Sequence, residues 1–237
     1  MTESNETPEP VATILVIEDE PQLRRFLRTS LPRHGYHVIE AETAAEGLAL
    51  AERERPDAVL LDLGLPDGDG VDVTRKLRTW MQAPIIVISA RGREQDKIDA
   101  LDAGAEDYVT KPFGLGELMA RIRVALRHMA RPTPDSIPDV TVVGDLTFDR
   151  AKRILLRRGE EIHLTKTQFK LFDHMLRNEG KILTHRQILK EVWGPAHSSQ
   201  THYLRVFMAQ LRQKIEQDPA RPRYLLTETG IGYRFKV

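Results

Sequence analysis

The sequence contains no cysteine among its 237 residues. A disulfide framework and a thiolate metal site are therefore both excluded. Long apolar runs are missing too, since none approaches the roughly 18 residues of a membrane-spanning helix. Residues 1–10 carry three glutamates but no lysine or arginine, which is not the pattern of a secretory signal. We therefore expect a cytoplasmic protein with no membrane partner.

The composition is that of a globular protein with two differently charged halves. Hydrophobic residues make up 41% and charged residues 30% of a chain long enough for one large domain or two ordinary ones. The formal net charge is zero, but residues 1–139 carry 17 basic and 25 acidic side chains, whereas residues 140–237 carry 18 and 10. The basic half is therefore the natural candidate for a nucleic-acid partner.

The first half alternates between apolar runs and segments of helical periodicity. Strands are predicted at 13–17, 37–41, 58–61, 84–89 and 107–110, and helices at 21–31, 43–53, 70–80, 95–103 and 115–126. This alternation predicts an α/β fold, a doubly wound parallel sheet with helices on both faces. We expect residues 1–11 to be a disordered tail and the proline-containing segment 129–139 to be a linker.

Polar side chains stand where the predicted strands end: Glu18 and Asp19 after the first, Asp62 after the third, Ser89 at the end of the fourth and Lys111 after the fifth. Because the carboxyl ends of parallel strands share one edge, these groups should converge. Carboxylate oxygens suit Mg²⁺, and a carboxylate can also be a nucleophile. Lys111 and Ser89 could then hold phosphoryl oxygens. Singly, each has a simpler explanation, as a helix cap, a turn residue or a solvated side chain.

The second half has shorter strand-like pieces and three helices. Strands are predicted at 140–143, 146–149, 154–157 and 161–163, helices from Thr165, from Thr184 and over 200–217, and a hairpin over 224–235. Three helices followed by a hairpin favour a winged helix-turn-helix domain over residues 140–237. The third predicted helix carries Leu204, Met208, Leu211 and Ile215 on one face.

The other faces of this third helix are polar and basic, which suits insertion into a major groove. An arginine on the hairpin could enter a minor groove. The alternative is a solvated helix face without a partner. The candidate DNA contacts are His202, Tyr203, Arg205 and Arg212 on the helix, and Thr229 and Arg234 on the hairpin.

Four segments resemble the receiver domain of two-component response regulators. They are Val-Ile-Glu18-Asp19-Glu, Leu-Leu-Asp62-Leu-Gly-Leu-Pro-Asp-Gly, Ile-Ser89-Ala-Arg and Gly-Ala-Glu-Asp-Tyr108-Val-Thr-Lys111-Pro-Phe. The resemblance covers residues 12–128 and implies a flavodoxin-like (βα)5 fold. It also implies that Asp62 accepts a phosphoryl group from a histidine of a sensor kinase.

The same resemblance implies roles for the neighbouring groups. Asp19, Asp62 and the carbonyl of Gly64 would bind Mg²⁺, with Glu18 assisting through water. Glu18 stands where many receivers have a second aspartate, so its reach differs. Ser89 and Tyr108 would form the switch pair beside Lys111, and the Lys111–Pro112 peptide bond should be cis.

Residues 140–237 resemble the winged-helix effector domain of the OmpR/PhoB family, through Trp193-Gly, Leu-Arg-Gln-Lys-Ile-Glu and Thr-Gly-Ile-Gly-Tyr-Arg-Phe. The resemblance is strongest to family members that regulate a high-affinity potassium-uptake operon. It implies a homodimer when phosphorylated, promoter DNA as ligand, and RNA polymerase as a further partner. Carried over by position, ion pairs across the dimer interface would be Lys97–Glu117, Asp107–Arg121 and Glu106–Arg123.

The main rival is an enzyme. Haloacid-dehalogenase-like phosphatases also use an aspartate nucleophile with Mg²⁺, but they need a second aspartate two residues later, where this chain has Gly64. A dinucleotide-binding domain would need a glycine-rich turn after the first strand, where Glu-Asp-Glu-Pro stands. A third reading makes the winged helix a protein-binding module, which its positive charge argues against. We therefore expect that the protein is not an enzyme. Its only reactions would be Mg²⁺-dependent self-phosphorylation from a phosphodonor and slow autodephosphorylation.

Overall fold

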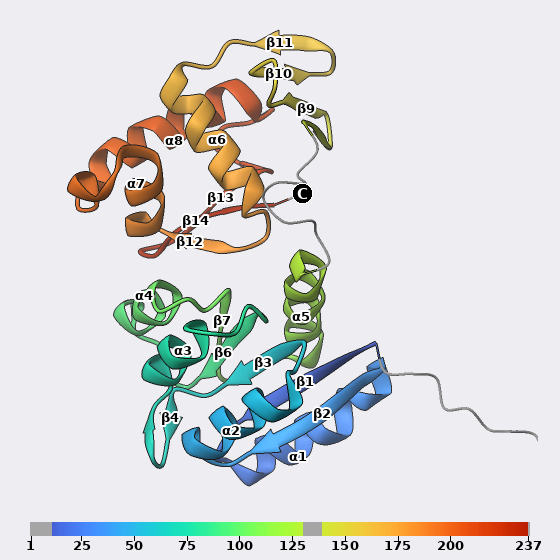
Figure 1. Cartoon of the computed structure of the whole chain (residues 1–237). Helices are drawn as coiled ribbons and strands as arrows, with labels where there is room; N and C mark the ends of the chain where they lie inside the picture. The colour runs from blue at the N-terminus through green and yellow to red at the C-terminus, as the bar shows by residue number, and fades with distance from the viewer. Residues whose placement is uncertain (1–10, 130–138, 237) are drawn as a thin grey trace, which may run out of the picture. The chain divides into compact units, whose positions relative to one another are not determined.

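The computed structural model describes residues 11–129 and 139–236 of the chain. The chain divides into two compact units, Met1–Ala130 and Arg131–Val237, and each is described by itself (Figure 1). The expected tail and linker fall almost entirely outside the described residues. Within the part that the structure describes, no helix is both long and apolar enough to cross a membrane.

The first unit is built on a five-stranded parallel sheet in the order β2-β1-β3-β6-β7. The strands are β1 (Ala12–Ile17), β2 (Tyr36–Ala41), β3 (Ala58–Leu61), β6 (Ile85–Ser89) and β7 (Asp107–Thr110). The central β3 and β6 are buried at every position, as expected for a parallel sheet covered on both faces. The predicted strands are confirmed to within one residue at each end.

Five helices cover this sheet: α1 (Pro21–Ser30), α2 (Ala44–Glu54), α3 (Gly70–Arg78), α4 (Glu94–Asp102) and α5 (Leu115–Met129). One apolar cluster joins the sheet to α1 and α5, through residues such as Leu27 and Ile122. Separate clusters join it to α2 and α3, through Ala51 and Leu77, and to α4, through Ala100. The doubly wound α/β fold is therefore confirmed.

Three short elements in this unit were not predicted. They are a 3-10 turn at Pro32–His34 and a two-stranded hairpin formed by β4 (Gly64–Leu65) and β5 (Gly68–Asp69). The turn of the hairpin is fastened to α2, because the Asp67 carboxylate accepts from Ala44 N at 2.7 Å and Ala45 N at 2.9 Å. These two N–H groups belong to the first turn of α2 and have no partner within the helix. The segment that follows Asp62 is thus held by side-chain contacts as well as by its own two strands.

The second unit begins with a four-stranded antiparallel sheet in the order β11-β10-β9-β8. Its strands are β8 (Val140–Val143), β9 (Leu146–Asp149), β10 (Ile154–Arg157) and β11 (Glu160–Ile162). The helices α6 (Lys166–Arg177), α7 (His185–Trp193) and α8 (Thr201–Ile215) follow, with a 3-10 turn at Pro195–His197. Thr165 and Thr184 start α6 and α7 with capping boxes completed by Gln168 and Gln187.

The chain ends in a three-stranded sheet, β12-β14-β13, in which β13 (Leu225–Glu228) and β14 (Gly232–Phe235) form the predicted hairpin. The third strand, β12 (Ile182–Thr184), was not predicted because its three residues precede α7 and pair with β14 far along the chain. Gly232 makes this pairing possible, since a Cβ there would lie 1.9 Å from the carbonyl oxygen of Leu183. Helices and hairpin together form the predicted winged helix-turn-helix.

Candidate functional site

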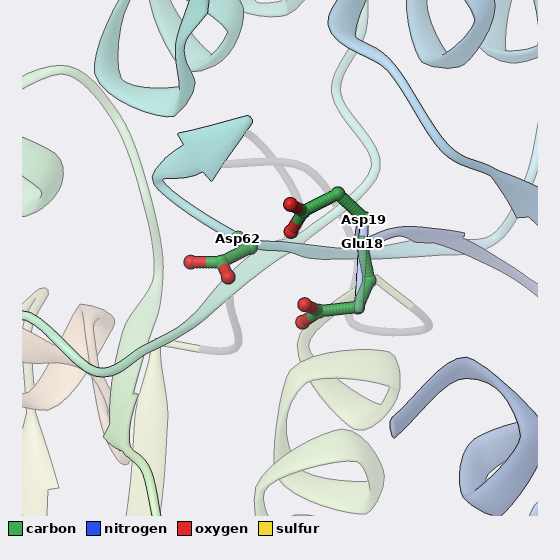
Figure 2. A group of neighbouring side chains, drawn as sticks. All are labelled: Glu18, Asp19 and Asp62. Carbon is green, nitrogen blue, oxygen red and sulfur yellow. The ribbon is translucent and has the colours of Figure 1, made fainter. Parts of the chain in front are cut away.

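The carboxyl edge of the parallel sheet brings three carboxylates together. Glu18 and Asp19 follow β1, Asp62 follows β3, and one oxygen from each lies within 4.8 Å of the others. Figure 2 shows the carboxylates of Glu18 and Asp19 pointing to the side on which Asp62 lies. Asp19 is exposed, whereas Glu18 and Asp62 are buried. An all-oxygen donor set open to solvent on one side fits Mg²⁺, which keeps several waters when it binds proteins.

Lys111 completes this cluster from the end of β7. Its ammonium donates to both carboxylate oxygens of Glu18, at 2.9 and 2.7 Å, and to Asp62 Oδ2 at 2.7 Å. The Lys111–Pro112 bond that follows is cis, as predicted. Lys111 therefore bridges the two buried carboxylates, and the predicted convergence is seen for all four charged groups.

The backbone around Asp62 is packed closely. The Asp62 N–H donates to Ile17 O at 2.9 Å, and Gly64 N donates to Asp62 Oδ1 at 3.2 Å. A Cβ on Gly70 would lie 2.3 Å from the carbonyl oxygen of Asp62. Only glycine therefore allows α3 to begin this close to the backbone of Asp62.

Ser89 and Tyr108 lie beside the cluster, and both are buried. The Tyr108 hydroxyl donates to the backbone carbonyl of Arg91. The Arg91 N–H donates to Ser89 Oγ at 3.2 Å. Arg91 was missed by sequence reasoning, although it stands two residues after Ser89 in one of the segments quoted above.

In the second unit, α8 has one buried and one exposed face. Leu204, Met208, Leu211 and Ile215 are buried, as predicted. On the exposed side, the exposed fractions of Tyr203 and Val206 are 57% and 41%. His202, Arg205 and Ala209 are exposed on the same helix. This face combines a cation with apolar surface, the combination that reads base edges and thymine methyl groups in a major groove.

Comparison with known proteins agrees with both units. A family model described as "Response regulator receiver domain" matches residues 14–123, and one described as "Transcriptional regulatory protein, C terminal" matches residues 159–235. The chain is 55% identical over 228 residues to the KDP operon transcriptional regulatory protein KdpE of Escherichia coli (strain K12), covering 96% of this chain and 100% of the relative. The chain belongs to the OmpR/PhoB-type response regulators.

Two further proteins are similar to this chain. The transcriptional regulatory protein KdpE of Mycobacterium tuberculosis (strain ATCC 25618 / H37Rv) is 50% identical over 224 residues, covering 94% of this chain and 99% of the relative. The crystal structure of the response regulator DrrB, a Thermotoga maritima OmpR/PhoB homolog, superimposes with a TM-score of 0.48 at 28% identity, covering 95% of this chain and 99% of that one. The two family models and the two KdpE relatives show that the protein is a two-component response regulator that controls transcription.

Burial and the lysine act differently on the two buried carboxylates of the receiver domain. Burial raises the pKa of Glu18 to about 7, with the nearby charge of Asp62 adding to the rise and Lys111 opposing it. For Asp62, burial is also the largest influence and raises the pKa, but Lys111, Gly64 N–H and Ser89 together hold it below its usual value. Asp62 is therefore ionised near neutral pH, whereas Glu18 is only partly ionised there.

The raised pKa of Glu18 predicts how receiver stability depends on pH. A group whose pKa is higher in the folded state stabilises the fold while protonated, and this contribution is lost as pH rises through about 7. With divalent cations chelated, the free energy of unfolding of the unaltered protein should fall relative to Glu18→Gln by roughly 3 kcal/mol between pH 4 and pH 8. Urea unfolding at a series of pH values measures this difference. A difference that stays constant with pH would contradict the raised pKa.

Five of the six residues predicted for the dimer interface form an ion pair or a cation–π contact within the part of the chain that the structure describes. Arg121 Nη1 lies 2.7 Å from Asp107 Oδ2, and Arg121 Nη2 lies 2.8 Å from Glu117 Oε1. Glu106 pairs with Arg78 at 2.5 Å. The Lys97 ammonium lies 5.7 Å from the centre of the Tyr108 ring, and Arg123 is exposed. The ion pairs across a dimer interface stay a prediction. To form them, Asp107, Glu117 and Glu106 would have to share or exchange their intrachain arginine partners.

Two of the predicted DNA contacts have intrachain partners in the winged-helix domain. Arg212 donates to Leu225 O at 2.9 Å and to Thr227 Oγ1 at 2.7 Å, which ties α8 to β13. Arg234 donates to Glu228 Oε1 at 2.7 Å and to Gly180 O at 3.2 Å. Both guanidinium groups hold the hairpin, and their contact with the duplex stays a prediction. Exposed candidates remain on α8 and at Thr229.

Proposed function

We propose that this response regulator accepts a phosphoryl group at Asp62 from a phosphohistidine of a sensor kinase. The observation that carries the proposal is the buried Asp62 carboxylate, which accepts from Lys111 at the edge of the acidic cluster. Asp62 Oδ attacks the phosphorus, an O–P bond forms, the P–N bond breaks and the histidine leaves. Mg²⁺, when bound, neutralises charge on the transferred group.

The residues of the chain have distinct tasks in this step. Glu18, Asp19, Asp62 and the Gly64 carbonyl would hold the metal ion. Lys111 and Ser89 would bind phosphoryl oxygens, since their ammonium and hydroxyl are side-chain donors beside Asp62. The histidine leaves as a neutral imidazole when its other ring nitrogen carries a proton, so transfer needs no general acid from this chain. This fits the Gly64 found where a phosphatase would carry its second aspartate.

We further propose that the regulated genes are a high-affinity potassium-uptake operon. The support is the name of the relative with 55% identity, a KDP operon regulator, over essentially its whole length. A footprint on the promoter of that operon in the same genome tests this, with and without a phosphodonor. Protection that appears at a different operon would keep the regulator and overturn only its target. We also propose that the protein acts in the cytoplasm and that RNA polymerase is its partner at this promoter.

Phosphorylation should act on DNA binding through dimerisation. A dimer offers two winged helices to two half-sites about 34–36 Å apart, so affinity rises by effective concentration. Arg123→Glu should therefore weaken dimerisation of the beryllofluoride-treated protein in sedimentation while leaving phosphoryl acceptance intact. Arg53→Glu, which reverses an exposed charge on α2, is the control. Arg121→Glu is a less clean change, because Arg121 also pairs with Asp107 within the chain. Equal dimerisation of all variants would place the interface elsewhere.

Arg205 and Arg212 should give different phenotypes. Arg205→Ala should weaken operator binding by about 5- to 150-fold, corresponding to 1–3 kcal/mol for a lost base contact, with unchanged thermal unfolding. Arg212→Ala should lower the unfolding temperature instead, because it removes hydrogen bonds to β13. Mobility shifts at several salt concentrations separate a base contact from a phosphate contact, since the latter lowers the salt slope by about one. Unweakened binding by Arg205→Ala would remove that residue from the interface.

A further inference from the structure

The side chain and the backbone of Arg91 contact several parts of the phosphoacceptor region. It lies in the loop between β6 and α4. Its guanidinium donates to Asp69 Oδ2 at 2.8 Å and to Leu63 O at 3.2 Å. Both of these partners belong to the segment that follows Asp62. The side chain of Arg91 therefore joins the two loops that flank the phosphoryl site.

The two groups that Arg91 binds, on Asp69 and Leu63, are themselves held in place. Asp69 is the N-cap of α3, and its other oxygen, Oδ1, accepts from Val71 N at 2.8 Å. Leu63 is fully buried and adjacent to Asp62. Both side chains of the ion pair are about 40% exposed. The Arg91 guanidinium also donates to the carbonyl of Leu63, which restricts where it can lie. A two-point contact of this kind fixes geometry better than a single exposed pair.

The backbone of Arg91 contacts both members of the switch pair. Its carbonyl accepts from the Tyr108 hydroxyl, and its N–H donates to Ser89 Oγ. The Tyr108 ring lies inward and is 5% exposed. The inward position of this ring therefore depends on where the β6–α4 loop places the Arg91 carbonyl.

We infer that Arg91 is a positioning residue of the switch, whose guanidinium, bound to Asp69 and Leu63 O, holds its own carbonyl where the inward Tyr108 hydroxyl binds. This inference deepens the proposed phosphorylation function and rests on it. Charge that arrives on Asp62 lies one residue from Leu63 and attracts the same guanidinium. One side chain thus senses the acceptor segment, while its backbone sets the conformation of Ser89 and Tyr108.

The first test needs no phosphoryl group. The full-length protein is labelled with 3-fluorotyrosine, and the Tyr108 signal among the five tyrosines is assigned by its loss in Tyr108→Phe. Arg91→Gln and Asp69→Asn should each shift the ¹⁹F signal of Tyr108 toward that of an exposed ring. Asp69→Asn keeps an oxygen to cap α3, so its effect reports the ion pair. Arg75→Gln, which removes a similar charge paired with Asp72 on α3, should leave the signal in place.

The second test measures the switch itself. The beryllofluoride concentration that gives half-maximal dimerisation should rise about fivefold in Arg91→Gln and in Asp69→Asn, and the double variant should be no worse than either. An unmoved Tyr108 signal in either variant, or an equal shift in Arg75→Gln, overturns the inference. Labelling of Asp62 by a phosphodonor is measured in parallel. If the phosphodonor does not label Asp62 in the unaltered protein, the proposed function is refuted, whatever the position of Tyr108.

Discussion

Asp62→Asn should reduce phosphoryl labelling by a small phosphodonor and Mg²⁺ to background. The amide of asparagine is not a nucleophile toward phosphorus, whereas the Asp62 carboxylate is held ionised by Lys111. Asparagine has nearly the same shape, and Lys111 keeps both oxygens of Glu18 as partners, so the fold should survive. The mass of the intact chain after removal of the donor measures the result.

A matched control separates the acceptor from other acids of the receiver domain. Asp72→Asn removes an exposed carboxylate on α3 that pairs with Arg75, and should leave labelling unchanged. Glu18 is bridged by the same lysine and is the substitute acceptor that this comparison would reveal. Undiminished labelling of Asp62→Asn would therefore move the phosphoryl group to another carboxylate and overturn the proposed chemistry.

Glu216→Ala should destabilise the winged-helix domain by on the order of 3–5 kcal/mol. Glu216 ends α8, is 3% exposed, and accepts three backbone N–H groups at the start of β13. The distances are 2.8 Å from Arg223 N, 2.9 Å from Tyr224 N and 2.8 Å from Leu225 N. An alanine leaves these donors without the carboxylate, and each buried donor left unsatisfied costs about 1–3 kcal/mol.

The chain offers a direct way to measure this loss. It has two tryptophans, Trp80 in the receiver domain and Trp193 in the winged-helix domain. In a Trp80→Phe background, urea unfolding followed by fluorescence reports on Trp193, which packs against Phe207. Glu161→Ala, which removes an exposed carboxylate from β11, should change stability by no more than about 0.5 kcal/mol. A Glu216→Ala variant as stable as this control would show that water replaces the carboxylate at no cost.

The receiver fold was predictable in detail because its signals are local. Apolar runs such as Ala58–Leu61 end at turn residues, so their bounds can be identified without knowing their neighbours. Parallel topology then requires Glu18, Asp62 and Lys111 to share one edge, which the structure confirms. The short strand β12 escaped prediction for the opposite reason, since only its pairing with β14 makes it a strand.

The partners of long side chains within the chain could not be predicted from the sequence. Helical periodicity correctly placed Arg212 away from the buried face of α8, but the guanidinium folds back to Leu225 O. The same holds for Arg234, which binds Glu228 and Gly180 O. Arg91 was overlooked because its partners, Asp69 and Leu63 O, lie in another loop. A flexible side chain several bonds long reaches acceptors whose positions depend on the packing of other elements.

By itself, the sequence determined the order and type of the main elements, the acidic edge with Asp62 at its centre, and the basic charge of the second half. These features depend on residue periodicity and on the rule that parallel strands end at one edge. Only the tertiary structure decided which cation meets which anion: Lys111 with Glu18 and Asp62, Arg91 with Asp69, and Arg121 with Asp107. The physical reason is the separation along the sequence of the groups that interact. Strand and helix formation is governed by neighbours in the chain, whereas these ion pairs form between groups that folding brings together.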